Sequence, residues 1–188
     1  MEADWEVEIG ARAPVLDPLW SGFVDLRATP NRISELAETL QFPPLASALA
    51  YLNSVESSLW TAKCDIWTIE DPSQIDPDEM EATIAEAAAA QACYVDVLPE
   101  RQSLFVSLEQ AESFGRNAVL NLRTLVSRCS RVDLIIRQAV AGEQQGFGIT
   151  VYITACGASP TAAEETLASA LAIVANTLCT TAVTLIQP

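Results

Sequence analysis

Four segments of this chain alternate apolar and polar residues, and this period of two constrains the fold more than any other feature. The segments are TAKCDIWTI, ACYVDVL, RVDLIIRQAV and GFGITVYITAC. Such alternation is typical of strands that bury one face, because successive side chains of a strand point to opposite sides of the sheet. The sequence therefore predicts a sheet with one apolar face.

Sequence patterns typical of helix starts lie before, between and after these segments. Thr29-Pro30 combines a cap with a proline at the first helical position, and Pro43-Pro44 opens a second apolar helix. Ser107 with Gln110 opens another helix, expected to run over 108–129, and the last helix begins near Thr161. Each of these helices has one apolar side with which to cover the sheet.

A further helix is expected to start within 70–91. Asp76 can cap it, Pro77 stands at its first position, and Glu79 completes a capping box. The capping pattern is that of an exposed helix start, so the acidic side chains here are interpreted first as solvated.

The order of these elements predicts an α+β fold. We expect helices first and then β-α-β-β-α-β-β-α, with the loop AGEQQG closing a hairpin. SLFVSL after Pro99 is a further candidate strand, and a short strand is expected after the last helix. We predict a mainly antiparallel sheet of about four to six strands with helices packed on one face, a two-layer sandwich, as one globular domain over residues 1–188.

The chain is strongly acidic, and this charge limits the kinds of partner that it can bind. It has 25 Asp and Glu against 10 Lys and Arg, a formal net charge of −15. Nucleic acids and anionic membranes bind proteins through Lys and Arg, so we expect neither as a partner. From Cys64 to Glu100 there are ten acids and no Lys or Arg. We expect a basic protein partner.

Histidine is absent from the chain, and this excludes several kinds of site. No Ser-His-Asp or Cys-His catalysis and no His-containing zinc site can form. The acidic run lacks the spacing of an EF-hand, and the seven glycines match no phosphate-binding loop. We expect no metal and no cofactor.

The five cysteines are scattered without a CxxC pair. Such a set indicates reduced thiols of a cytoplasmic protein, and one disulfide stays open as an alternative. The first ten residues lack the basic and apolar regions of a secretory signal, so none is expected.

Cys156-Gly157 stands where a strand is expected to lead into the last helix. A thiol or an anion site at a helix start is one interpretation. Glu164 and Glu165 bring negative charge to the same helix end, and no histidine can accept the thiol proton. We interpret the pair as a structural turn with a buried cysteine.

No charged residue occurs from Thr166 to Pro188. The stretch is long enough to cross a membrane, yet it contains Asn176 and several threonines and has no basic flank. We expect a largely buried helix and no membrane contact. Leu171 and Val174 would be interface residues if the chain were a homo-oligomer.

The polar sides of the predicted strands form the main candidate site. If the apolar sides all meet the helices, the opposite face gathers aromatic, charged and hydroxyl side chains. Trp, Tyr and Arg are enriched at binding hot spots. The expected members of this polar sheet face are Lys63, Asp65, Trp67, Tyr94, Asp96, Arg131, Asp133, Arg137 and Tyr152.

These observations favour a non-catalytic binding protein, such as an inhibitor, an immunity-type protein, an adaptor or a chaperone. The acidic 65–86 region, which includes Asp76, Asp78 and Glu79, would steer a basic partner towards the polar sheet face. Aromatic side chains such as Trp67 and Tyr94 would supply the buried contact. Two alternatives stay open. One is an enzyme or small-ligand-binding domain that uses Asp65, Asp96 and Asp133 with Arg131 or Arg137. The other is a homo-oligomer, for example a homodimer, assembled through the last helix.

Overall fold

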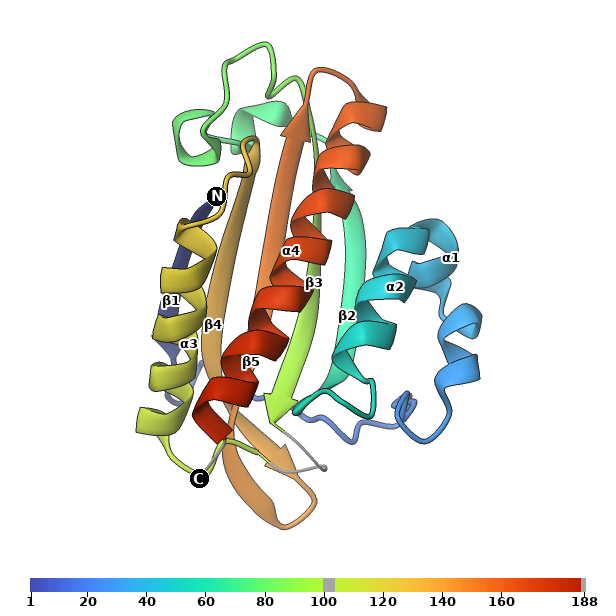
Figure 1. Ribbon diagram of the computed structural model, residues 1–188, viewed down its shortest axis with the longest axis vertical. Coiled ribbons are helices and arrows are strands. Elements are labelled where there is room, and N and C mark those ends of the chain that lie inside the picture. Colours follow the sequence, from blue (N-terminus) through green and yellow to red (C-terminus); the bar gives the residue numbers. More distant parts are fainter. Residues whose placement is uncertain (100–103, 187–188) are drawn as a thin grey trace.

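The computed structural model describes residues 1–99 and 104–186 and contains a five-stranded sheet with helices over one face (Figure 1). The strands lie in the order β1-β4-β5-β3-β2; β1 is parallel to β4 and the other neighbours are antiparallel. This confirms the predicted α+β fold. The elements are β1 (Glu2–Glu8), α1 (Ala37–Gln41), α2 (Pro43–Leu52), β2 (Leu59–Ile69), β3 (Ala89–Pro99), α3 (Leu108–Arg123), β4 (Ser130–Ala141), β5 (Gln144–Gly157) and α4 (Pro160–Ile186).

The alternating segments form strands as predicted, and their apolar sides make the core. In the middle of the sheet Leu134 pairs with Val151, and Val151 pairs in turn with Val95. All three are buried together with the apolar residues of the helices. The Gly142-Glu143 turn between β4 and β5 confirms the predicted hairpin, and Gly142 has a φ of 62°, which favours glycine.

The helices lie side by side on the apolar face of the sheet (Figure 1). α4 runs along β5 and β3, with α3 on its β1 side and α2 on its β2 side. The Ser107 hydroxyl accepts a hydrogen bond from the Gln110 N–H at 3.2 Å, which confirms the predicted start of α3. At the start of α4, Ser159 accepts from the Ala162 N–H at 3.2 Å. Serine caps therefore open both long helices.

The prediction of a helix that starts within 70–91 is wrong. Residues 70–88 instead form a loop with two short 3-10 turns, Pro72–Gln74 and Asp78–Met80. Asp76 accepts from the Asp78 N–H at 2.9 Å, which is a local turn and not a helix cap. The buried side chain of Met80 packs with Ala90 and Cys156 at one end of the sheet. Tertiary burial of this loop overrides the capping pattern.

Smaller differences concern helix ends. The segment after Thr29 is a 3-10 helix, Pro30–Glu35, followed by the short α1. The Thr29 hydroxyl caps no helix and donates to the Asp25 carbonyl at 2.7 Å. α3 ends at Arg123, so the expected helix over 108–129 is too long by about two turns.

Two expected strands are not formed. In the described part of SLFVSL, Phe105 makes an isolated bridge to Phe147, and Ser103 lies outside the described residues. α4 continues to Ile186 where a terminal strand was expected. Among the described helices, α4 is long and apolar enough over Pro160–Val183 to cross a membrane, and 56% of its apolar window is buried inside the protein.

On the outer strand β1, side chains form hydrogen bonds with backbone groups. The Ala3 carbonyl accepts from Arg123 Nε at 2.8 Å, and the Trp5 N–H donates to the Asp4 carboxylate at 2.8 Å. Exposed strand edges are templates for further pairing, and proteins block them with charged side chains. β1 follows this pattern.

The opposite outer strand, β2, is bonded in the same way. The Thr61 N–H donates to Asn53 Oδ1 at 3.1 Å, and the Ile66 N–H donates to the Asp65 carboxylate at 2.8 Å. An aspartate therefore accepts a backbone N–H on each outer strand of the sheet, Asp4 on β1 and Asp65 on β2.

Leu171 is 2% exposed and belongs to the core between α4 and the sheet. We expect Leu171→Ala to lower the free energy of unfolding by about 2–5 kcal/mol, because it leaves a cavity. Leu120→Ala, at a site that is 55% exposed on α3, should change it by less than about 0.5 kcal/mol. Urea unfolding followed by circular dichroism measures both, and equal effects would contradict the assignment of Leu171 to the core.

Candidate functional site

The polar sheet face forms as the alternation predicts, on the side of the sheet opposite the helices. The strand register places one row of side chains straight across all five strands. Going across the sheet, the row is Asp4, Asp133, Tyr152, Tyr94 and Asp65. Two aromatic rings thus stand at the centre of the row, with carboxylates on both sides.

Three aromatic side chains form a continuous group on this face. The ring centroids of Tyr94 and Tyr152 are 5.7 Å apart, and those of Trp67 and Tyr94 are 6.4 Å apart. Trp67 is 37% exposed, and both tyrosines are half-buried. Burial, followed by the nearby charges of Asp96 and Asp65, raises the pKa of Tyr94 to about 12, so its hydroxyl stays protonated at neutral pH. The group offers a rigid, partly exposed aromatic surface.

Arg131 is held by two carboxylates. It donates to both oxygens of Asp133 at 2.9–3.0 Å, and its guanidinium lies 3.2 Å from Glu79. The bond to Glu79 ties the 70–88 loop to the sheet. The charge of Arg131 is therefore neutralised within the protein.

Arg137 joins four strands through a chain of hydrogen bonds. It donates to Glu8 on β1 at 2.7 and 2.9 Å and to the Thr150 hydroxyl on β5 at 3.1 Å. Thr150 in turn donates to the buried carboxylate of Asp96 on β3 at 2.7 Å. One hydrogen-bond network on the polar sheet face thus joins Glu8, Arg137, Thr150 and Asp96.

Asp96 is the one carboxylate of the face that is almost fully buried, at 3% exposed. Burial raises its pKa from 3.8 to about 6, and the Thr150 hydrogen bond and the charges of Lys63 and Arg137 offset part of this effect. Lys63 lies near the aromatic side chain of Trp20, with its Nζ 5.3 Å from the ring.

Two segments cover the ends of the face and leave its middle open. The segment before the first 3-10 helix brings Leu16 against Leu98 and Trp60 at one end. The 70–88 loop brings Met80 against Ala90 at the other end. These segments therefore cover the polar sheet face only at its ends.

Two hollows flank the aromatic group. One of about 580 Å³ lies over β1, β4 and β5 and is lined by Asp133, Arg131, Arg137 and Tyr152, among others. The second, of about 440 Å³, lies at β2 and includes Asp65. The lining of neither hollow includes Asp96. The three aspartates of the enzyme alternative therefore share no single pocket, although the pKa of one of them is perturbed.

The sequence reasoning missed the contribution of β1 to this face. Glu2, Asp4, Glu6 and Glu8 alternate with the buried or half-buried Ala3, Trp5 and Val7 and pair with β4. The same alternation that placed the other strands was visible here. The alternation does not show that β1 pairs in parallel with β4. This pairing brings the acidic side chains of β1 beside Asp133 and Arg137.

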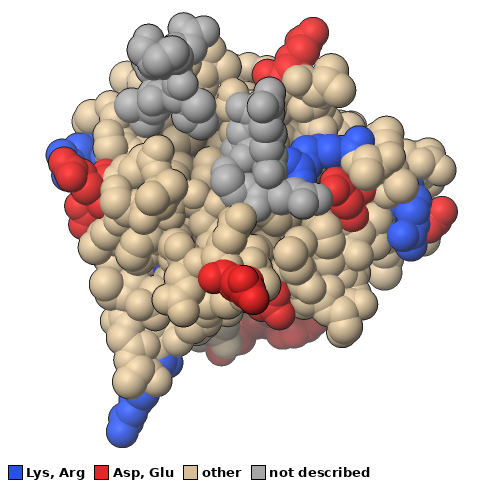
Figure 2. Space-filling view, turned by 90° about the horizontal axis from the view of Figure 1, so that it is seen from below, with Lys and Arg blue, Asp and Glu red and all other residues tan. Residues whose placement is uncertain are grey.

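The free charge around the face is negative. Among the described residues, the carboxylates of Glu6, Asp65, Asp76 and Asp78 make no ion pair. Of the cations, Arg131 and Arg137 do, and Lys63 does not. Asp76 and Asp78 are exposed on the 70–88 loop and not on the sheet itself. The end of the molecule with the β4–β5 hairpin shows mostly uncharged residues, with small scattered charged groups, in several of which acidic and basic residues lie next to each other (Figure 2).

Cys156 lies at the end of β5, fully buried beside Met80. Burial, followed by its contact with Cys129, raises the pKa of the Cys156 thiol to about 12, which is the opposite of an activated nucleophile. A side-chain carbon at Gly157 would overlap the backbone nitrogen of Ala163. The glycine therefore allows β5 to approach α4 closely, as expected of a structural turn.

Within residues 1–99 and 104–186, no group of three or more Cys, Asp or Glu side chains has the arrangement of a metal site. All five cysteines are free thiols.

Comparison with known proteins found no match to a family model, to a curated protein or to a solved structure. The site is therefore interpreted from its own geometry.

The raised pKa of Asp96 makes stability depend on pH. The folded protein takes up this proton near pH 6 and the unfolded chain only near 3.8. The buried charge is therefore unfavourable to folding above pH 6, and the penalty disappears as the pH falls towards 4. Asp96→Asn keeps an acceptor for Thr150 and should raise the free energy of unfolding by on the order of 2 kcal/mol at pH 8 but hardly at pH 4. Urea unfolding of both proteins across this range checks it, and a gain that does not vary with pH would contradict it.

The buried Cys156 should resist alkylation. We expect iodoacetamide at mildly alkaline pH to leave Cys156 unmodified in the folded protein and to modify it in urea, as read by peptide mass spectrometry. The half-buried Cys129 of the same chain serves as the internal comparison. Fast modification of folded Cys156 would reopen the nucleophile interpretation.

Proposed function

We propose that this protein is a non-catalytic acidic binding protein that engages a basic protein partner through the polar sheet face. The observation that supports this most is the open group of Trp67, Tyr94 and Tyr152 set among carboxylates. Large aromatic side chains with few rotatable bonds are frequent hot spots of protein interfaces. A solvated sheet face with no partner would not need three of them together.

The distribution of charge supports a basic partner. The two arginines of the face are already bound to Glu8, Glu79 and Asp133, so they have little charge left to offer an anionic ligand. The one further cation, Lys63, lies over the Trp20 ring. The carboxylates of Asp65, Asp76 and Asp78 remain available to a basic surface. Such uncompensated charge speeds association with an oppositely charged partner and weakens with salt.

Inhibitors, immunity-type proteins, adaptors and chaperones of basic proteins are the classes that act in this way. The proposal places the protein in the cytoplasm, where its five free thiols would stay reduced. It includes no nucleic acid, membrane or cofactor. The enzyme alternative has one supporting observation, the perturbed Asp96, but this carboxylate lines neither hollow of the face.

The test begins with affinity purification of the tagged protein from its source cell at low and high salt, followed by mass spectrometry. We expect one basic protein that is retained at low salt and depleted at high salt. Trp67→Ala with Tyr94→Ala should raise the dissociation rate of that complex about 10- to 100-fold, because these side chains are its anchors. Surface plasmon resonance with the purified partner measures the rates.

Two matched pairs of charge reversals distinguish steering by Asp76 and Asp78 from an effect of net charge alone. Asp76→Lys with Asp78→Lys should slow association about tenfold at low salt. Glu56→Lys with Glu143→Lys changes the net charge equally at exposed sites outside the face and should have much less effect. Equal effects of the two pairs, or a partner whose binding ignores the aromatic variant, would sink the proposal.

A further inference from the structure

Two cysteines lie directly opposite each other where β4 begins and β5 ends. Ser130 pairs with Ala155, and the next residues in the same antiparallel register are Cys129 and Cys156. The Cys156 N–H donates to the Cys129 carbonyl at 2.8 Å. Opposed residues that are hydrogen-bonded in this way have Cα atoms about 5.5 Å apart, which is within the range that a disulfide bridges.

The side chains of these two cysteines also meet. Both pack in the apolar cluster that Met80 of the 70–88 loop closes at this end of the sheet. After burial, the nearby thiol of Cys129 is the largest cause of the raised pKa of Cys156. Cys129 has a φ of 60°, a backbone conformation that residues other than glycine rarely adopt and that proteins keep where the surroundings or the function require it.

The cysteines of β2 and β3 lack this geometry. Cys64 pairs with Val95 and Cys93 pairs with Ile66, so the two cysteines are diagonal neighbours across the strands. Cα atoms of diagonal neighbours are about 7–8 Å apart, and a disulfide does not span this distance without movement of the backbone.

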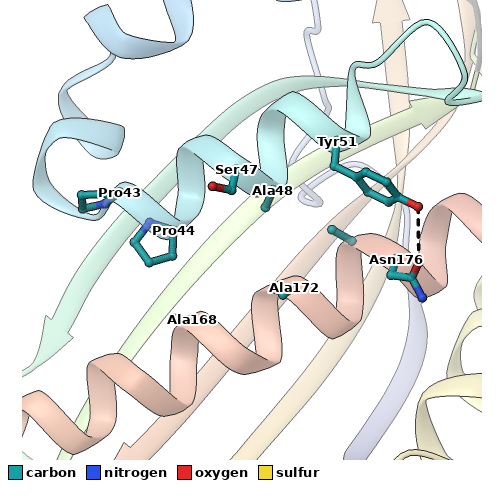
Figure 3. Close-up of a pocket in the computed structure, with 9 residues that line it drawn as sticks. Pro43, Pro44, Ser47, Ala48, Tyr51, Ala168, Ala172 and Asn176 are labelled. Atoms are coloured by element: carbon teal, nitrogen blue, oxygen red, sulfur yellow. Dashed lines mark hydrogen bonds between the residues drawn. The ribbon is translucent and has the colours of Figure 1, made fainter.

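The fifth cysteine, Cys179, lies on α4 on the other side of the sheet. It stands beyond the uncharged groove of about 570 Å³ between α2 and α4, at the end where the Tyr51 hydroxyl donates to Asn176 Oδ1 at 3.3 Å (Figure 3). The Cys179 thiol is 3.5 Å from the Ser57 hydroxyl. The strand register therefore selects one pair among the five thiols.

We propose that Cys129 and Cys156 form a reversible intrachain disulfide when the protein meets a peroxide. Cys129 reacts first, because it is half-buried whereas Cys156 is fully buried beside Met80. Its sulfur attacks one oxygen of hydrogen peroxide, the O–O bond breaks, and a sulfenic acid and one water result. The Cys156 sulfur then attacks the Cys129 sulfur. The S–S bond forms, the S–O bond breaks, and the hydroxyl leaves as water with the Cys156 proton.

The placement of Cys156 suits it to this second step. A thiol with a pKa of about 12 is mostly protonated at neutral pH, which slows its attack. Its sulfur already lies beside the target, however, and such placement acts as a very high effective concentration. Thiol reductants reverse the bond, so the same pair stays reduced in a cytoplasm without peroxide.

Peptide mass spectrometry of the isolated chain tests the bond. The folded protein is treated with hydrogen peroxide at pH 8, its remaining thiols are blocked in urea, and it is digested without reductant. Trypsin with a glutamate-specific protease is required, because Glu164 and Glu165 are the cleavage sites that separate Cys156 from Cys179. We expect peptides joined through Cys129 and Cys156, which dithiothreitol separates.

Single substitutions distinguish a selected pair from general oxidation. Cys129→Ser should abolish the joined peptides. Cys156→Ala should leave the sulfenic acid of Cys129 without its second thiol, so that dimedone traps about tenfold more of it than in the wild type. Cys93→Ala changes another fully buried cysteine and should leave the bond intact. Circular dichroism shows that each variant is folded.

Two results would overturn the proposal. The first is oxidation of Cys129 to a sulfinic acid, or no oxidation at all, without joined peptides. The second is a bond that joins Cys64 to Cys93, or Cys179 to any other cysteine, in preference to the pair at β4 and β5. The experiment contains no partner protein, so its result is independent of the proposed function.

Discussion

Burial of the apolar sides of β3, β4 and β5 under α4 is the interaction on which the rest of the structure depends. Because a strand points successive side chains in opposite directions, packing one set against a helix fixes the other set on the far side. Val95, Val151 and Leu134 enter the core, and Tyr94, Tyr152 and Asp133 are thereby aligned on the opposite face. The polar sheet face is therefore a direct result of the core.

The candidate site was predictable where this alternation governs it, and the residues expected on β2, β3, β4 and β5 do share one face. The 70–88 loop was not predictable, because the burial of Met80 against the sheet decides its shape and a capping pattern reports only local hydrogen bonds. The same holds for β1. Its alternation is visible, but its parallel pairing with β4 depends on how distant segments meet.

The net charge of the chain does not show how its charged side chains are distributed over the molecule. The arginines of the face are bonded to carboxylates of other strands and loops, so they help to hold the sheet together. The remaining acids stay free around the aromatic group, and the side formed by α2 and α4 has a groove without charge. One chain thus offers an acidic surface and an uncharged one on opposite sides of a single sheet.

The side chains that bond the outer strands have a consequence for misfolding. Fibrils grow when an open strand accepts the backbone of the next molecule, layer upon layer. Here Asp4 and Arg123 hold backbone groups of β1, and Asp65 and Asn53 hold those of β2. An incoming chain would have to displace these bonds first, so the folded protein is a poor seed for amyloid even though half of its residues are hydrophobic.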